Sequence, residues 1–440
     1  MGLVLRPQLT FKLHSWDSFA SRVRMVYASV KRRAAAMKAL CALMMVAGAM
    51  LLASADDDVR QQDVSPAQRL APGMSGAYFT YSTNANRHDP SLRMKTLDSC
   101  FGRFNDAECE VNFRFRQHEL LQLFDQLGFP ASVRIGATAS WGGMVFHKSE
   151  LLLVMLRRLA YPCRLADLRP MFGLSSPQLS VVFEYAVGFL TQKYERMLRS
   201  PCIWGDYIPG WADCIFDKIG RFDCVFAFID GTVRHISRPG PRAVPGVADR
   251  VDVQRLFYSG HKRKHAIKFQ TMVAPCGLII HLFGPHPGRG NDAGMFRTSG
   301  LAGALARLRV LMQHVVDVNG HAISYYVYGD PAYRNSAYMM RSIFGLGMTI
   351  QDALVNTDMS KGRICVEWQY GELLQLFAFL DFSRGLQLFL SPIHHYFVAG
   401  VLLLNCRLCM RGIEGKTARY FNCTPPSLIE YLSMWNDRRL

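Results

Sequence analysis

The chain has 440 residues, more than the roughly 100–200 that one compact core usually contains, so we expect two or three folded units. Half of the residues are apolar, which excludes a chain that is disordered along most of its length. The net charge of +17 favours a polyanionic partner such as nucleic acid, although solubility alone would also explain it.

The amino-terminal segment, residues 1–60, combines a basic cluster with an apolar run. The uncharged run Ala39–Ala55 follows the basic stretch Arg22–Lys38. It is short for a membrane span, which takes about 20 residues, and its small-residue end resembles a secretory signal. We favour a hydrophobic helix with a basic flank over membrane contact through residues 39–55. The membrane-anchored or secretory alternative stays open.

Turn-forming and polar residues predict a linker over residues 61–99, and helical periodicity predicts a helical domain over 100–222. Within that domain, a short helix from Leu165 would end at Gly173. Ser175 and Pro177 would then begin a second helix. This outline fits a helix-turn-helix and an ordinary helical hairpin equally well.

The 12 cysteines do not resemble a disulfide framework, because they are scattered singly apart from one pair. A reducing compartment is the better expectation. Cys406 and Cys409 have the spacing of zinc ligands, but they lie in an apolar stretch, Tyr396–Cys409, that predicts a helix. We therefore expect buried core thiols there rather than a metal site.

Short β-prone runs replace the helical pattern over residues 223–410. Strands are expected at 224–229, 266–274, 278–283 and 323–328, with a helix at 301–314 and further helices to residue 410. Residues 411–440 are expected to form a tail. This order predicts an α/β domain, a mixed sheet flanked by helices, after an all-helical amino-terminal domain.

Three acids are candidates for binding a metal ion. Asp230 and Asp330 each follow a predicted strand, and ligands bind at such strand ends. Glu367 is the single acid in an apolar segment, where an unpaired Glu is unusual. Carboxylates that converge repel each other unless a cation lies between them, and Mg²⁺ or Mn²⁺ suits oxygen ligands. Any one of these acids could equally be a helix cap, a turn residue or a solvated charge.

Five sequence blocks carry a family resemblance. They occur in this order: Phe228–Arg234 (FIDGTVR), Tyr258–Gln270 (YSGHKRKHAIKFQ), Gly284–Asp292 (GPHPGRGND), Tyr328–Tyr333 (YGDPAY) and Val366–Gly371 (VEWQYG). Together they resemble the DDE endonuclease domain of PIF/Harbinger transposases and their domesticated nuclease-like relatives, over roughly residues 110–410. A single Asp-Gly or Gly-Asp pair carries no weight, whereas five blocks in order are quite specific.

The resemblance implies an RNase H-like fold, a nuclear location, and catalytic, metal-binding roles for Asp230, Asp330 and Glu367. It implies hydrolysis of a DNA phosphodiester followed by attack of a 3′-hydroxyl on target DNA, with two divalent ions, Mg²⁺ or Mn²⁺. Asp230 would bridge both ions, while Asp330 and Glu367 would each hold one. Asp292 matches a recurring family Asp, and we expect it to shape the loop near the site rather than to bind the metal.

A basic stretch beside the first strand is the predicted DNA contact. Arg255, Lys262, Arg263, Lys264 and Lys268 lie in a segment without acids. We favour phosphate binding over the alternative of a hairpin edge protected by lysines.

The chain departs from the family pattern after Glu367, and this leaves alternatives open. The stretch Leu373–Leu380 lacks the basic residues that relatives carry there, so contacts with the DNA backbone near Glu367 are in question. The resemblance also implies a separate Myb-like DNA-binding partner and a homo-oligomer. The alternative to an active nuclease is a domesticated, catalytically silent DNA-binding or scaffold protein of the same fold.

Overall fold

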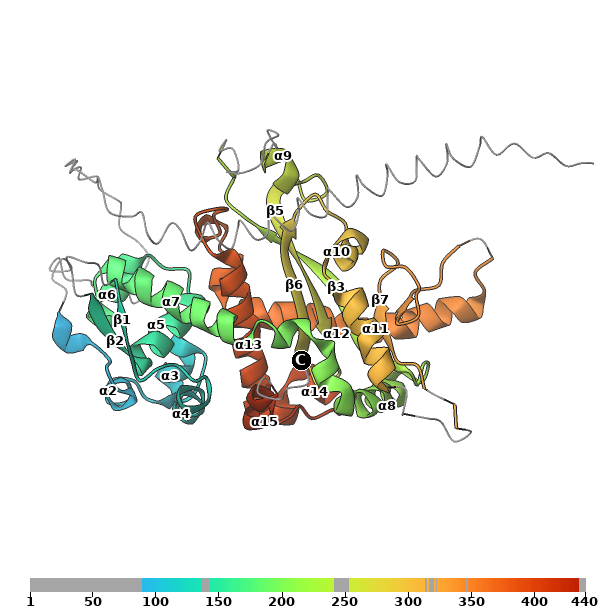
Figure 1. Cartoon of the computed structure of the whole chain (residues 1–440), viewed down its shortest axis with the longest axis horizontal. Coiled ribbons are helices and arrows are strands. Elements are labelled where there is room, and N and C mark those ends of the chain that lie inside the picture. The colour runs from blue at the N-terminus through green and yellow to red at the C-terminus, as the bar shows by residue number, and fades with distance from the viewer. Residues whose placement is uncertain are drawn as a thin grey trace, which may run out of the picture. The chain divides into compact units, whose positions relative to one another are not determined.

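The computed structural model describes residues 89–136, 143–240, 253–312, 315, 320–321, 323–345 and 347–434 (Figure 1). The predictions for the amino-terminal segment, including the apolar run at 39–55, fall outside these residues, as does most of the predicted linker.

Helices dominate the first part of the described chain. Their bounds, with those of two short strands, are η1 (Pro90–Leu92), α2 (Leu97–Phe101), α3 (Asp106–Phe113), α4 (Gln117–Gln126), β1 (Ser132–Ile135), β2 (Met144–His147), α5 (Lys148–Ala160), α6 (Leu165–Phe172), α7 (Ser176–Tyr194), η2 (Met197–Arg199), η3 (Pro201–Tyr207) and α8 (Ile208–Ile219). The antiparallel pair β1–β2 departs from the all-helical prediction. Its strands have only four residues each, too few to show a clear alternation in the sequence.

The expected pair of helices is present as α6 and α7. Gly173 ends α6 with φ of 58°, a conformation that glycine adopts without strain. Ser175 caps α7, as predicted. However, α7 buries one face against α5 and α13 (Ile393–Arg411), and the Gln178 side chain completes the cap by accepting the Ser175 N–H. Gln178, one of the few base-reading side chains in this helix, is therefore already engaged.

The second part of the chain folds around a six-stranded sheet. Its elements are β3 (Val225–His235), α9 (Val253–Phe257), β4 (Tyr258–Ser259), β5 (Lys264–Val273), β6 (Ile279–Pro287), α10 (Asp292–Thr298), α11 (Leu301–Leu311), β7 (Tyr326–Gly329), β8 (Met339–Arg341), α12 (Ile350–Leu376), η5 (Ala378–Asp381), η6 (Ser383–Gly385), α13, η7 (Gly412–Glu414), α14 (Lys416–Phe421) and α15 (Leu428–Ser433).

The sheet is mixed, as the sequence predicts. β5 lies between β6 and β3 and is antiparallel to both. On its other side β3 pairs in parallel with β7, which pairs in parallel with β8, and β4 adds a short pair to β5. α8 and α12 pack on β3, while α13 packs on β6. This mixed α/β architecture is consistent with the RNase H-like fold that we expected.

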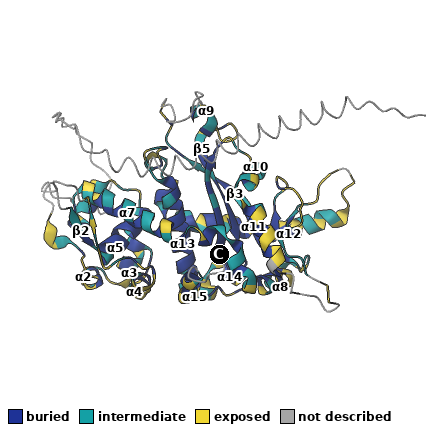
Figure 2. Ribbon diagram, viewed as in Figure 1, coloured by how far each residue is buried: buried dark blue, intermediate teal, exposed yellow. Residues whose placement is uncertain are grey.

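The core runs through the strands and α13, as Figure 2 shows in dark blue. By length and composition, the stretch Ile393–Glu414 is apolar enough to cross a membrane, yet 72% of its apolar 18-residue window is buried inside the protein. Such burial is typical of a core helix. Cys406 and Cys409 are buried in it, in agreement with their predicted place as core thiols.

The segment after residue 410 differs from the predicted tail. α14 and α15 bury apolar side chains, among them Phe421 and Leu428, and pack against α8 and α13. Both helices have only six residues, so their periodicity is too short to stand out in the sequence.

Candidate metal centre

Two of the predicted acids lie side by side because their strands are neighbours. Ile229 on β3 pairs with Gly329, the last residue of β7, so Asp230 and Asp330 follow paired positions. The prediction that Asp330 follows a strand is confirmed. The prediction that the first strand ends at Asp230 is wrong, because β3 continues to His235 by pairing with β5. Asp230 lies within β3, one residue beyond the position at which the shorter parallel strand β7 ends.

A third carboxylate, that of Asp292, joins them. Asp230, Asp292 and Asp330 each offer an oxygen, and these oxygens lie within 4.8 Å of one another. Asp292 is the first residue of α10, whose amino-terminal cap is Asn291. We expected Asp292 to shape the loop, yet its carboxylate is part of the cluster. The only signal in the sequence was its place in the third family-like block.

Gly231 lets Asp292 come this close. A Cβ atom at Gly231 would lie 2.8 Å from Oδ1 of Asp292 and 2.9 Å from its Cγ. The Lys268 ammonium holds the same Oδ1 from the other side at 3.2 Å. In addition, the Gln270 amide donates to the backbone oxygen of Asp292 at 3.4 Å and to the Tyr333 hydroxyl at 2.8 Å. The position of Asp292 therefore depends on β3 and β5 as well as on its own loop.

The electrostatics of the cluster favour a bound cation. The pKa of Asp230 is raised to about 6, mainly by burial; the Arg363 guanidinium opposes the rise, and the carboxylates of Asp330 and Asp292 add to it. Burial also raises the pKa of Asp330, and the charge of Asp292 adds to that rise. A divalent ion would offset both the burial and the mutual repulsion, and three carboxylates are the hard oxygen ligands that Mg²⁺ and Mn²⁺ take. These residues fit such an ion.

α12 supports Asp230 through two side chains. The buried Tyr370 hydroxyl donates to the Asp230 backbone oxygen at 3.1 Å and accepts from the Thr271 hydroxyl at 2.7 Å. Arg363, two turns earlier on the helix, forms an ion pair with Asp230, with Nη1 2.5 Å from Oδ2. Tyr370 lies in the fifth family-like block, but neither residue was predicted to be part of the site, because each also fits an ordinary helix.

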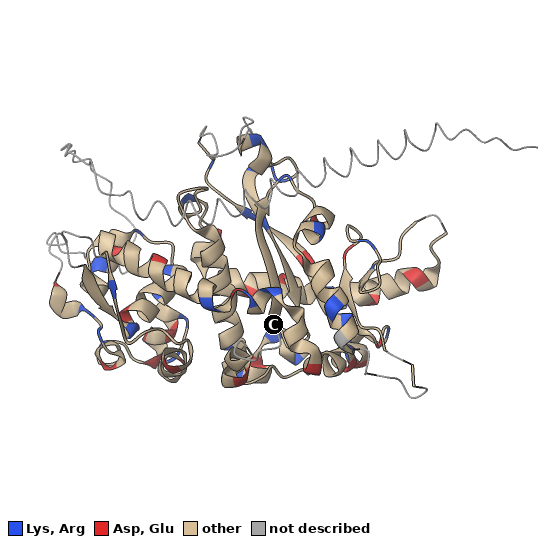
Figure 3. Cartoon of the chain, in the orientation of Figure 1, with Lys and Arg blue, Asp and Glu red and all other residues tan. Residues whose placement is uncertain are grey.

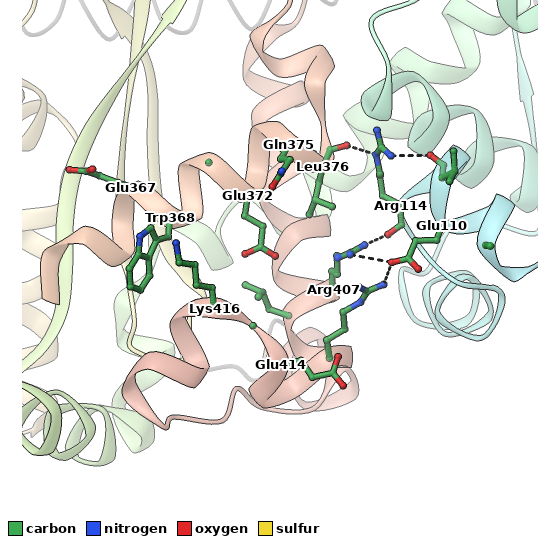
Figure 4. A pocket seen from close by; sticks show the side chains of 16 residues that line it. Glu110, Arg114, Glu367, Trp368, Glu372, Gln375, Leu376, Arg407, Glu414 and Lys416 are labelled. Carbon is green, nitrogen blue, oxygen red and sulfur yellow. Dashed lines mark hydrogen bonds and ion pairs between the residues drawn. The ribbon is translucent and has the colours of Figure 1, made fainter. Parts of the chain in front are cut away.

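Glu367, the third predicted acid, is exposed on α12 and is not among the three carboxylates that converge. It lies one turn after Arg363 and one turn before Tyr370, so helix geometry places it on the face of α12 that both residues use to reach Asp230. Figure 4 shows its carboxylate turned away from that of Glu372.

A cavity of about 920 Å³ adjoins Glu367 between α3, α12 and the end of α13 (Figure 4). Its arginines are already engaged within the protein. Arg114 donates to the Leu376 carbonyl, Arg407 to the Arg114 carbonyl, and Arg411 to Glu110 at 2.8 Å. These guanidinium groups therefore join α3 to the helices that cover the sheet, and they do not form a phosphate site.

Four of the predicted DNA contacts are exposed near one end of the sheet. Arg255 lies on α9, Lys262 and Arg263 lie in the turn before β5, and Lys264 begins β5. Figure 3 shows several Lys and Arg positions, in blue, around α9 and the adjoining end of β5. Lys268 differs, because it is half-buried and pairs with Asp292. Its position ties it to the metal centre rather than to the exposed group.

The fold and the site together define a mixed α/β domain with a cluster of three carboxylates at the end of a parallel strand pair. Residues 229–405 match the family model described as DDE superfamily endonuclease, and this segment contains Asp230, Asp292, Asp330 and Glu367. The match supports a nuclease- or transposase-like function for the domain, with DNA as the substrate class and a divalent metal ion as cofactor. No curated protein and no solved structure matches the chain.

Proposed function

We propose that this chain is a metal-dependent DNA endonuclease and strand transferase of the cut-and-paste, Harbinger type, acting in the nucleus. The convergence of Asp230, Asp292 and Asp330 inside the segment that matches DDE endonucleases carries the proposal. Ions bound there would activate the attacking oxygen and stabilise the leaving one.

Each acid has a role in this proposal. Asp230, which β3 and α12 both fix in place, would be a ligand of both ions. Asp330 and Asp292 would complete the ligands of the first ion. Glu367, on the face of α12 that carries Arg363 and Tyr370, would be a ligand of the second ion, as the resemblance implies.

The exposed basic group holds the DNA backbone. Three consecutive exposed residues at one end of β5 form this group: Lys262, Arg263 and Lys264. The same strand carries Lys268 beside Asp292. Phosphate contacts of this kind position the duplex without reading its sequence. A separate Myb-like partner and a homo-oligomer would supply sequence recognition and the pairing of DNA ends.

A catalytically silent DNA-binding protein of the same fold is the second candidate. Two observations favour it: Arg363 forms an ion pair with Asp230, and Glu367 is outside the cluster of three carboxylates.

One experiment separates the two candidates. Asp230→Asn should abolish Mg²⁺-dependent strand cleavage and leave DNA binding intact or tighter, because a negative charge near phosphate is removed. Replacing Lys262, Arg263 and Lys264 by Ala should weaken binding on all sequences alike and flatten the slope of log affinity against log salt by about 0.9 per lost contact. Asp98→Asn, an exposed acid on α2, is the charge-matched control.

Unaltered cleavage by the Asp230 variant would show that the metal assignment is wrong. If the wild type cuts no DNA with Mg²⁺ or Mn²⁺ while the basic group still controls binding, the silent DNA-binding protein becomes the correct description.

A further inference from the structure

Both carboxylate oxygens of Asp230 accept hydrogen bonds from other groups of the chain. Oδ1 accepts the N–H of the next residue, Gly231, at 2.7 Å. Oδ2 accepts from Nη1 of Arg363 at 2.5 Å. An ion that takes Asp230 as a bridging ligand therefore competes with a guanidinium for the same oxygen.

The two contacts that α12 makes with Asp230 differ in kind. Tyr370 is buried and reaches the backbone oxygen, so it fixes the position of the helix against β3. Arg363 is longer, keeps 23% of its side chain exposed and reaches only the carboxylate. The Arg363 side chain can therefore leave Asp230 while the helix stays in place.

Resting on the proposed function, we propose that Arg363 is an exchangeable counter-ion, which pairs with Asp230 in the metal-free protein and with a phosphate of the DNA substrate once a divalent cation has taken Asp230. A divalent ion on Oδ2 would repel the guanidinium at the same oxygen, so metal binding would favour displacement of Arg363.

The displaced guanidinium then needs another anion. Asp230 is the one acid among the described residues with which Arg363 forms an ion pair, and a partly buried charge left without a partner is costly. A phosphate arriving at the metal centre matches the planar fork of an arginine, which can donate two hydrogen bonds to it.

Binding of Mn²⁺ to the full chain without DNA tests the first half of the exchange. Calorimetric titration of the wild type, Arg363→Gln and Arg363→Lys should show roughly tenfold tighter binding for the Gln variant, because a competing positive charge is gone. The Lys variant should stay near the wild type. Arg221→Gln, whose arginine pairs with Asp358 elsewhere on α12, is the matched control and should bind Mn²⁺ as the wild type does.

DNA binding with and without a divalent ion tests the second half. With saturating Ca²⁺, in place of a metal that permits cleavage, Arg363→Gln should bind DNA several-fold more weakly than the wild type, and its salt slope should be shallower by about 0.9. In EDTA the two proteins should bind alike, because Arg363 is then held by Asp230. If Arg363→Gln loses the same DNA affinity in EDTA as in Ca²⁺, the proposed exchange of Arg363 from Asp230 to a DNA phosphate is wrong.

The outcomes distinguish this inference from the proposed function. If wild-type Mn²⁺ binding needs Asp230 but Arg363→Gln binds the ion no more tightly, the counter-ion role is wrong and the metal centre stands. If the wild type binds no Mn²⁺, or Asp230→Asn binds it equally well, the metal centre itself is wrong and the inference falls with it. Thermal unfolding of each variant in EDTA shows whether it is folded.

Discussion

Gly231 decides how close the acids of the metal centre can come. Its backbone lies in β3 directly after Asp230, and the Asp292 carboxylate occupies the space where a side chain would be. A Cβ atom 2.8 Å from Oδ1 would be closer than real contacts allow, so either Asp292 or the strand must shift. A single methyl group can therefore test whether Asp292 binds metal.

Gly231→Ala should weaken Mn²⁺ binding by about tenfold or more, the effect of losing roughly 1.4 kcal/mol of ligand interaction. Titration of the ion by calorimetry measures this, with thermal unfolding as a check on folding. Gly371→Ala on α12 is the control, because no atom lies within 4 Å of its added Cβ and the site is exposed. It should leave Mn²⁺ affinity unchanged and stabilise the helix by up to about 1 kcal/mol. Unchanged affinity in the Gly231 variant would exclude Asp292 as a ligand.

The sequence predicted part of this centre and missed part of it for physical reasons. Asp230 and Asp330 follow β-prone runs, so the pleated strands that carry them are visible in the sequence. Asp292 begins a helix after a glycine-rich loop, and the path of such a loop depends on packing against β5. Arg363 was missed because a charged residue on a helix is usually solvated. The metal role of Glu367 stays a prediction.

Among the elements, α13 links the two parts of the chain through charged groups at its end. Arg411 donates to Glu119 on α4 at 2.8 Å and 3.1 Å, and Glu119 is only 2% exposed. The Glu119 carboxylate also accepts the N–H of Arg116, which completes a capping box at the start of α4. Without the Arg411 guanidinium, the buried Glu119 carboxylate would keep the Arg116 N–H as a hydrogen-bond donor but would lose the positive charge that balances its own.

Arg411→Met should therefore lower the free energy of unfolding by about 3 kcal/mol, the usual cost of breaking a buried pair from one side. Urea unfolding followed by circular dichroism measures the loss. The comparison is Arg221→Met, which breaks a more exposed pair with Asp358 and should cost less than about 1 kcal/mol. Adding Glu119→Gln to Arg411→Met should recover part of the loss. A double variant no better than the single one would argue against the unpaired charge as the cause.

Element type was easier to predict than element boundaries. The helices α6 and α7 begin and end at capping residues that the sequence displays, Gly173 and Ser175. The length of β3 was not predictable in this way, because it is set by pairing with β5 rather than by its own residues. The packing of α14 and α15 likewise depends on α8 and α13, which are distant in sequence.

For the whole molecule, the predicted division at residue 222 cuts across a shared core. Phe183 on α7 stacks on Tyr396 of α13 with ring centroids 5.2 Å apart, and the Tyr396 hydroxyl donates to Glu184 at 2.5 Å. α8, which precedes the division, packs on β3. Periodicity cannot show such contacts, because each helix has the same pattern whichever partner covers its apolar face.

The first described residues are held by the helical part of the chain. Arg93 donates to both oxygens of Glu150 on α5, at 2.6 Å and 2.8 Å, and the Glu150 side chain is only 1% exposed. Arg93 also donates to the Val145 carbonyl at 2.9 Å, and the buried Ser149 hydroxyl donates to the Met94 carbonyl. The boundary of a stable fragment should therefore lie before Arg93, inside the segment that the sequence predicts as linker.

Two truncations that differ by six residues test this boundary. A fragment that begins at Asp89 keeps the Arg93–Glu150 pair and should fold, bind Mn²⁺ and bind DNA. A fragment that begins at Lys95 leaves Glu150 buried without its guanidinium and should lose about 3–5 kcal/mol of unfolding free energy. In the shorter fragment, Glu150→Gln should restore part of that loss of unfolding free energy, because a neutral amide leaves no unpaired charge.

Urea unfolding of the three proteins measures these differences in unfolding free energy. Equal stability of the Asp89 and Lys95 fragments would show that Arg93 contributes nothing, whereas failure of both to fold would place an essential contact before residue 89.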